Sequence, residues 1–160
     1  MLPDAEATEA LGAALARGFR EGPGGGVLYL RGELGAGKTT CARSLLRTLG
    51  VVGLIRSPTY TLVEAYRTAG LTCIHVDLYR LGSAAEVDEL GLRDYLDTDC
   101  LMLVEWPARG AAALPPADLD LTLSYRGSAR GAELDAPTPR GARLLELLLH
   151  DTSLALYVSN

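Results

Sequence analysis

The sequence lacks both kinds of segment that would direct a protein into or across a membrane. No run within its 160 residues approaches the roughly 18 to 20 apolar residues that a membrane-spanning helix needs. Residues 1–6 carry acidic side chains, whereas a secretory signal peptide begins with positive charge. We therefore expect a cytoplasmic protein with no membrane association.

An excess of positive charge is also absent. The chain has 15 lysine and arginine residues against 20 aspartate and glutamate residues, which gives a net charge of -5 at pH 7. This is the wrong sign for a protein that holds a nucleic-acid backbone mainly by neutralising its phosphates. We therefore do not expect the chain to bind tRNA or DNA tightly on its own.

Cysteine is scarce, and its spacing argues against a metal site or disulfides. The three cysteines, Cys41, Cys73 and Cys100, are odd in number and widely separated, and each lies in an apolar stretch. Zinc sites need cysteines at short, clustered spacings. We interpret all three as reduced thiols of the core.

Lysine is the scarcest of the charged residues. Of the 15 basic residues, 14 are arginine, and the single lysine is Lys38. A compact, flexible ammonium group differs from a planar guanidinium in what it can bind. A chain that uses arginine everywhere else therefore marks Lys38 as a position where the ammonium group is required.

The length and composition indicate one globular domain. Hydrophobic residues make up 48% of the chain and charged residues 22%, which is usual for a folded domain of this size. We expect a single domain over residues 1–150. Residues 151–160 carry no strong signal and are interpreted as a C-terminal tail.

Hydrophobic periodicity and turn residues predict an α/β fold with a mainly parallel central sheet. The expected strand at 100–105 is the most apolar segment and should be central. Strands 62–66 and 71–77 should form a hairpin, and strands 119–125 and 130–135 are interpreted as antiparallel additions. The remaining expected elements are a strand at 27–30 and helices at 5–19, 39–49, 84–90 and 139–149.

A phosphate-binding motif joins the first expected strand to the second expected helix. Residues 32–39 match G-x-x-x-x-G-K-[ST] in full. In this setting the loop N–H groups can surround a phosphate at the positive end of the helix. Lys38 would then bridge the β- and γ-phosphates, and the Thr39 hydroxyl would bind Mg²⁺. The bland alternative is a surface turn with an incidental lysine. The motif and the element order together predict a three-layer sandwich like that of P-loop NTPases.

Two carboxylates compete for the second protein ligand to Mg²⁺. Glu105 and Asp77 both end expected strands, where ligands gather in open α/β sheets. The residues alone leave this choice open. They also leave open whether loop 57–61 senses a γ-phosphate and whether Trp106 is a core ring or a lid. His75 is interpreted as an ordinary histidine within a strand.

Five short blocks of sequence together resemble a known family. They read GELGAGKTT at 32–40, SPTYTLV at 57–63, HVDLYRL at 75–81, ELGL at 89–92 and EWP at 105–107. This ordered set is similar to the TsaE family, the bacterial P-loop ATPases needed for threonylcarbamoyladenosine modification of tRNA. The resemblance covers roughly residues 5–149, and only the first block is shared with unrelated NTPases.

The resemblance implies a set of site residues and two cofactors, ATP and Mg²⁺. Thr39 and Glu105 would bind Mg²⁺, Asp77 would act with Lys38 and Glu105 in catalysis, and the roles of Thr59 and Thr61 in the switch-like loop stay open. The implied ATP-binding residues are Thr8, Gly35, Ala36, Gly37, Lys38, Thr39, Thr40 and Arg130.

The resemblance also implies an ATP hydrolase that is weak alone and acts with the subunits TsaD and TsaB. The protein would meet tRNA only indirectly, through that complex, which agrees with the acidic net charge. Two alternatives stay open. One is a nucleotide-dependent binding module that needs no hydrolysis. The other is a small-molecule kinase, although the chain has no arginine-dense insertion of lid length.

Overall fold

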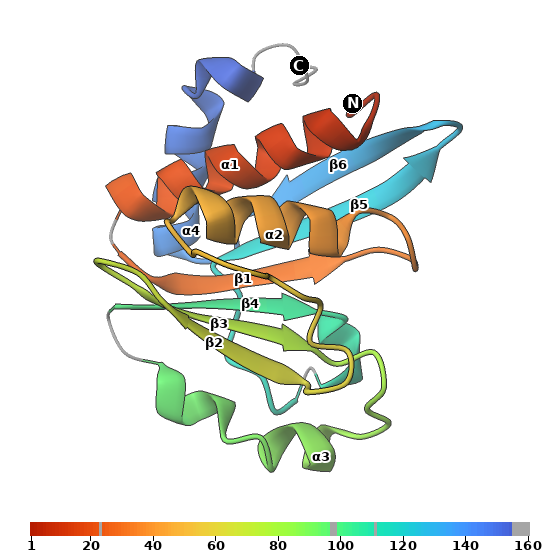
Figure 1. Cartoon of the computed structure of the whole chain (residues 1–160), viewed down its shortest axis with the longest axis vertical. Coiled ribbons are helices and arrows are strands. Elements are labelled where there is room, and N and C mark those ends of the chain that lie inside the picture. Colours follow the sequence, from red (N-terminus) through yellow and green to blue (C-terminus); the bar gives the residue numbers. More distant parts are fainter. Residues whose placement is uncertain (23, 97–98, 111, 155–160) are drawn as a thin grey trace.

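The structure is a computed structural model of the whole chain, and it describes residues 1–22, 24–96, 99–110 and 112–154. Its centre is a six-stranded sheet with the strand order β2-β3-β4-β1-β5-β6 (Figure 1). The strands are β1 (Gly26–Arg31), β2 (Val63–Arg67), β3 (Thr72–Asp77), β4 (Cys100–Glu105), β5 (Leu119–Arg126) and β6 (Ala129–Asp135). The helices are α1 (Ala5–Glu21), α2 (Lys38–Thr48), α3 (Ala84–Asp88) and α4 (Pro139–Leu149), with 3-10 turns η1 (Leu92–Tyr95), η2 (Pro107–Arg109) and η3 (Thr152–Leu154).

The strand directions confirm the expected mainly parallel sheet and correct one detail. Strands β3, β4, β1 and β5 run parallel, while the edge strands β2 and β6 are antiparallel to their neighbours. The prediction that residues 119–125 form an antiparallel addition is therefore wrong, because β5 runs parallel to β1 and only β6 of this pair runs against the parallel strands. Alternation of apolar and polar residues reports which face is buried, whereas strand direction depends on where the connection from β4 re-enters the sheet.

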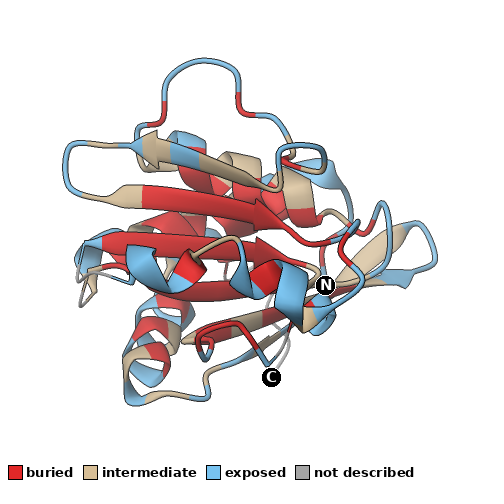
Figure 2. Ribbon diagram, turned by 90° about the horizontal axis from the view of Figure 1, so that it is seen from below, coloured by how far each residue is buried: buried red, intermediate tan, exposed pale blue. Residues whose placement is uncertain are grey.

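Each face of the sheet has its own core. Leu28 and Leu30 of β1 pack with residues of α1, α2 and α4, whereas Val27 and Tyr29 pack on the other face with residues of α3 and η1. Figure 1 shows the long helices α1 and α2 on one side and the short α3 on the other. Figure 2 shows the central strands as the most continuously buried part of the chain. The expected three-layer sandwich is therefore present, with long helices on one face of the sheet and the short helix α3 and 3-10 turn η1 on the other.

Helix α2 is held close to α1 by a glycine. Asp4 caps α1 by accepting a hydrogen bond from the N–H of Ala7 at 2.8 Å. A Cβ atom at Gly12 would lie 2.4 Å from the carbonyl oxygen of Cys41, so no other residue allows the two helices to approach this closely. This contact fixes the helix that follows the phosphate-binding motif.

The chain after α4 also packs on α1. The guanidinium of Arg17 donates to Asp151 at 2.7 Å, and Leu154 is buried in the core on the helical side of the sheet. Of the expected tail at 151–160, residues 155–160 lie outside the described residues. No helix among the described residues is long and apolar enough to cross a membrane.

The three cysteines are buried, and, as all three are described, no disulfide joins any two of them. Burial raises the pKa of the thiols of Cys41 and Cys73 to about 12. A thiol with such a high pKa is almost entirely protonated near neutral pH and is therefore a poor nucleophile and metal ligand. This agrees with the interpretation of these cysteines as core residues.

Candidate nucleotide site

The phosphate-binding motif forms the turn between β1 and α2. Gly37 precedes the first residue of α2 with φ 108°, a left-handed conformation that favours glycine. A Cβ atom at Gly37 would also lie 3.2 Å from the methyl group of Thr8. Within the described chain no side chain caps this end of α2, so its first N–H groups are available to an anion.

Lys38 lies in this turn and is almost fully buried, with 4% of its surface exposed. Its Nζ donates to the carbonyl oxygens of Gly32 and Glu33, both at 2.8 Å, and lies 4.1 Å from the centre of the Trp106 ring. Burial lowers the pKa of Lys38, and the carboxylates of Glu105 and Asp77 oppose that shift. The ammonium group is therefore held inside the turn, facing both carboxylates.

Glu105 ends β4 directly beneath the start of α2. The Thr39 hydroxyl donates to both of its carboxylate oxygens, at 3.1 Å to Oε1 and 3.0 Å to Oε2. His75 Nε2 lies 2.9 Å from Oε1 on the inner side. Glu105 is only 2% exposed, so these contacts fix how the carboxylate faces the turn. The structure thus brings together Thr39 and Glu105, the two residues expected to bind Mg²⁺.

Asp77 ends β3, the neighbouring strand, and holds a different segment. Its Oδ2 accepts hydrogen bonds from the hydroxyls of Thr59 at 2.8 Å and Ser57 at 3.1 Å. Its Oδ1 accepts from the backbone N–H of Tyr79 at 3.0 Å. The loop at 57–61 is therefore attached to Asp77 through Ser57 and Thr59, whereas Thr61 is exposed.

Trp106 lies beside the site and is half-buried, which answers the question of whether it is a core ring. Its backbone has φ 58°, an uncommon conformation for a large residue. One side of the ring faces the ammonium group of Lys38, and the ring of Tyr79 packs against it with 5.0 Å between centres. Trp106 therefore covers the buried lysine.

Tyr125 is a residue of the site that the sequence did not reveal. Its hydroxyl donates to the carbonyl oxygen of Leu34 in the turn at 2.9 Å, and a Cβ atom at Gly35 would lie 2.6 Å from that hydroxyl. The guanidinium of Arg130 lies over its ring at 4.3 Å. Strand β5 thus supports the turn from outside through a contact between residues 91 positions apart.

Two hollows flank the turn, and every expected site residue lines one of them. The first, of about 270 Å³, contains Lys38, Thr39, Asp77, Glu105 and Trp106 among its walls. The second, of about 160 Å³, lies between the turn, the start of α1 and the β5–β6 hairpin. The expected residues that line the second hollow are Thr8, Gly35, Ala36, Gly37, Thr40 and Arg130.

The start of the chain is attached at the second hollow. Leu2 and Arg130 exchange backbone hydrogen bonds of 2.8 and 2.7 Å, and this pairing brings the beginning of α1 beside the β5–β6 hairpin. Thr8, which is 2% exposed, donates to the carbonyl oxygen of Asp4 at 3.2 Å. Thr8 and Arg130, 122 positions apart in the numbering, therefore lie on one hollow.

The oxygen groups at the end of β4 suit Mg²⁺ only if further ligands come from outside the chain. Among the described residues, no group of three or more His, Cys, Asp or Glu side chains could hold a metal ion. Mg²⁺ prefers six oxygen ligands and is often bound by one or two protein groups together with water and substrate phosphates. The Thr39 hydroxyl and the Glu105 carboxylate fit that pattern next to a phosphate-binding turn.

Comparisons with known proteins agree on one family. The model of the family "Threonylcarbamoyl adenosine biosynthesis protein TsaE" matches residues 2–132. The tRNA threonylcarbamoyladenosine biosynthesis protein TsaE of Haemophilus influenzae is 45% identical over 119 residues, 74% of this chain and 75% of that protein. Its counterpart from Synechocystis sp. is 42% identical over 112 residues, 68% of this chain and 69% of that protein.

A solved structure gives the same result. The crystal structure of Bacillus subtilis YdiB superposes with a TM-score of 0.75 at 31% identity, covering 91% of this chain and 89% of that one. The match of the family model and the similarity to these relatives extend over most of the chain. The chain therefore belongs to the TsaE family.

Proposed function

We propose that this protein binds ATP with Mg²⁺ and hydrolyses it in support of threonylcarbamoyladenosine modification of tRNA. The observation that carries the proposal is the contact between Thr39 and Glu105 at the mouth of a complete phosphate-binding turn. That contact joins the hydroxyl and the carboxylate that a Mg²⁺-nucleotide site requires. The names of the relatives support the pathway in which this activity would be used.

Different residues of the first hollow would bind the phosphates and the Mg²⁺. In this proposal Lys38 Nζ exchanges its two carbonyl partners, Gly32 and Glu33, for phosphate oxygens. The N–H groups at the start of α2 donate to the same phosphates. Bound Mg²⁺ would neutralise charge on the phosphates, and Thr39 and Glu105 are the residues that would hold it.

Asp77 suits a role in turnover. It is 3% exposed and lines the hollow next to Glu105. A carboxylate in this position can orient a water molecule and accept its proton as the γ-phosphate is cleaved. Ser57 and Thr59 hold Asp77 through hydrogen bonds, so movement of their loop would change how the carboxylate faces the hollow.

The second hollow suits the nucleoside end of ATP. It adjoins the first hollow, because Gly35, Gly37 and Thr40 line both, and it combines the small, buried Thr8 with the cationic Arg130. ATP bound with its phosphates on the turn would therefore extend toward Thr8 and Arg130.

The same proposal includes partner subunits. TsaD and TsaB are the proposed partners, and the chain would meet tRNA only through them, in the cytoplasm. The net charge of -5 supports this division, because a chain of that charge has little affinity for a polyanion. We expect weak ATP hydrolysis by the isolated protein and little tRNA binding at physiological salt.

The experiment that tests the proposal measures ATP binding, release of inorganic phosphate and tRNA modification, with and without TsaD and TsaB. We expect ATP binding that depends on Mg²⁺ and phosphate release that increases in the complex. Absence of Mg²⁺-dependent ATP binding would overturn the proposal. Full tRNA modification with a Glu105→Gln variant that does not hydrolyse ATP would instead indicate a nucleotide-dependent binding module. Transfer of the phosphate to a small molecule would indicate a kinase.

A further inference from the structure

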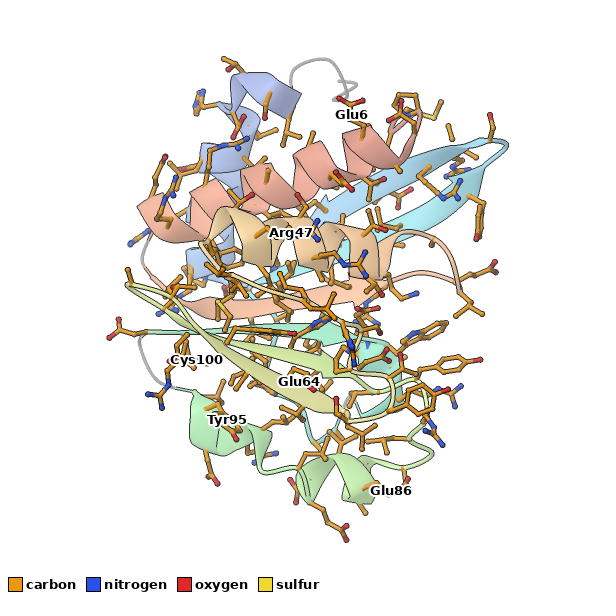
Figure 3. The ribbon with its side chains drawn as sticks, in the orientation of Figure 1. Glu6, Arg47, Glu64, Glu86, Tyr95 and Cys100 are labelled. Carbon is orange, nitrogen blue, oxygen red and sulfur yellow. The ribbon has the colours of Figure 1, made fainter. Side chains whose placement is uncertain are left out.

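His75 is a buried polar residue beside the site, and the proposed function assigns it no role. It lies near the end of β3, opposite Leu103 of β4 and Glu64 of β2, and none of its side chain is exposed. Figure 3 shows Glu64 on the neighbouring edge strand β2. His75 therefore sits in the sheet interior, where an apolar residue is usual.

Among the described residues, the one polar contact of the His75 ring is with Glu105. His75 Nε2 lies 2.9 Å from Glu105 Oε1. Because a carboxylate oxygen accepts hydrogen bonds, we assign Nε2 as the donor of this bond. The other ring nitrogen, Nδ1, is buried and has no hydrogen-bond partner in the part of the chain that the structure describes.

The unpartnered Nδ1 indicates that packing is not the reason for a histidine at position 75. Burial of a polar atom without a partner opposes folding, so packing alone would favour an apolar side chain at this position. The favourable feature that histidine adds is the hydrogen bond to Glu105. We therefore look for the role of His75 in its effect on the orientation of the Glu105 carboxylate.

The two oxygens of Glu105 differ in their partners. Oε1 accepts from both His75 and Thr39, whereas Oε2 accepts from Thr39 alone. The bond from His75 fixes the rotation of the carboxylate from its inner side. Oε2 therefore keeps more unused acceptor capacity than Oε1, on a carboxylate that lines the hollow.

We propose that His75 is a positioning residue, which holds Glu105 through Oε1 so that Oε2 is directed at the Mg²⁺ of the bound nucleotide. This inference rests on the proposed function. It deepens that function, because it assigns the orientation of the metal-binding carboxylate to a residue that touches neither metal nor nucleotide. Hydrogen bonds that orient ligating carboxylates commonly change metal affinity by 10- to 100-fold.

The test compares two substitutions of His75 with a control at the other histidine. His75→Leu removes the donor and keeps an apolar side chain of similar size. His75→Gln keeps an N–H donor at nearly the position of Nε2. The chain has 2 histidines, and His150→Gln changes the exposed one, at the end of α4 and outside both hollows.

Two measurements separate positioning from folding. One is the Mg²⁺ midpoint of the nucleotide-induced change in Trp106 emission, and the other is the thermal unfolding midpoint without ligand. We expect His75→Leu to raise the Mg²⁺ midpoint by roughly 10-fold or more. We expect His75→Gln to restore most of that loss, His150→Gln to match wild type, and the unfolding midpoints not to follow the Mg²⁺ midpoints.

The outcomes are distinguishable from failure of the proposed function. If wild type shows no Mg²⁺-dependent nucleotide binding, the proposed function is wrong. If wild type binds but His75→Leu has the same Mg²⁺ midpoint, only the positioning role is wrong. Equal losses in both His75 variants that follow their unfolding midpoints would also overturn it.

A spectroscopic measurement tests the hydrogen bond without any substitution at His75. Nitrogen-15 spectra of the imidazole rings, assigned with His150→Gln, report which ring nitrogen carries the proton. We expect a protonated, hydrogen-bonded Nε2 in His75. A ring protonated only on Nδ1 would overturn the proposal even if His75→Leu fails to fold.

Discussion

Asp77 and Glu105 are paired in the register of β3 and β4, yet each carboxylate holds a different part of the chain. Glu105 accepts hydrogen bonds from Thr39 at the start of α2, and Asp77 accepts them from Ser57 and Thr59 of the loop before β2. The carboxylates face one hollow from adjacent strands. Glu105 is thus joined to the residue that follows Lys38 in the phosphate-binding motif, whereas Asp77 is joined to the loop at 57–61.

Substitution of these two carboxylates should therefore affect different steps. Glu105→Gln keeps the shape and removes the charge beside Thr39, so we expect it to weaken the Mg²⁺ dependence of nucleotide binding and to stop turnover. Asp77→Asn should impair turnover and leave the affinity for Mg²⁺ and nucleotide closer to wild type. Each protein is titrated with Mg²⁺ in the presence of nucleotide while Trp106 emission is recorded.

The Trp106 signal suits this comparison because it is the only tryptophan and follows Glu105 directly. Glu64→Gln, a change to another glutamate on the edge strand β2, controls for the loss of one negative charge. A shifted Mg²⁺ midpoint in Asp77→Asn with an unchanged midpoint in Glu105→Gln would show that the two roles are reversed.

The sequence predicted the separate segments of this site but not which of them lie next to each other in the fold. The turn at 32–39 and the buried strand ending at Glu105 were predictable, because both patterns lie within a few consecutive residues. The residues alone did not decide between Asp77 and Glu105, and only the family resemblance favoured Glu105, because the choice depends on which strand lies next to Thr39. Strand order is set by tertiary packing.

The sequence did not predict the roles of His75 and Tyr125, because both depend on hydrogen bonds between residues far apart in the chain. His75 was interpreted as an ordinary strand histidine because its partner Glu105 is 30 positions away. Tyr125 gave no signal at all, since a tyrosine at the end of an alternating strand fits any exposed edge. The contact of its hydroxyl with Leu34 exists only because β5 lies beside β1.

Lys38 should be irreplaceable. Lys38→Ala removes the only cation of the turn, and we expect ATP affinity or turnover to fall by about 100-fold or more. Lys38→Arg should not restore it, because a planar guanidinium cannot occupy the narrow space between two loop carbonyls and Trp106. Steady-state ATP hydrolysis and equilibrium nucleotide binding measure the two quantities.

The matched control for Lys38 is Arg47→Ala, which removes a positive charge from the other end of α2. Figure 3 shows Arg47 on that helix. We expect this variant to retain ATP binding. Near-normal ATP hydrolysis in Lys38→Ala would contradict the assignment of the turn to phosphate binding.

The ion pair between Arg17 and Asp151 should make the protein less stable as the pH falls into the acid range. The Arg17 guanidinium, which donates to Asp151 at 2.7 Å, lowers the pKa of that carboxyl to about 2. Because this pKa is depressed in the folded protein, the stabilisation is present above the unfolded value of about 3.9 and is lost as the pH falls toward 2.

Asp151→Asn tests this pair directly. We expect it to reduce the free energy of unfolding by about 1 kcal/mol near pH 7, the upper end for a pair that is partly exposed. The difference from wild type should shrink as the pH falls from about 4 to about 2. Denaturant unfolding at several pH values measures it, with Asp135→Asn on the exposed part of β6 as the control. A difference that is independent of pH would rule out the ion pair as its cause.

Tyr125 should affect nucleotide binding although it lies outside the motif. Its hydroxyl donates to the carbonyl oxygen of Leu34 and holds the exposed half of the turn against β5. Tyr125→Phe removes that hydrogen bond, which is typically worth about 1 kcal/mol, and keeps the ring under Arg130. We expect nucleotide affinity to fall by roughly 5-fold, the equivalent of that energy, with little change in the thermal unfolding midpoint.

Tyr95→Phe serves as the control, because Tyr95 is an exposed tyrosine of η1, on the other face of the sheet from α1 and α2 (Figure 3). It should bind nucleotide as wild type does. The loss in Tyr125→Phe should appear in the dissociation constant for ATP more than in the turnover rate, because Leu34 lines the hollow while Asp77 and Glu105 keep their own partners. Unchanged ATP affinity in Tyr125→Phe would mean that the turn holds its conformation without support from β5.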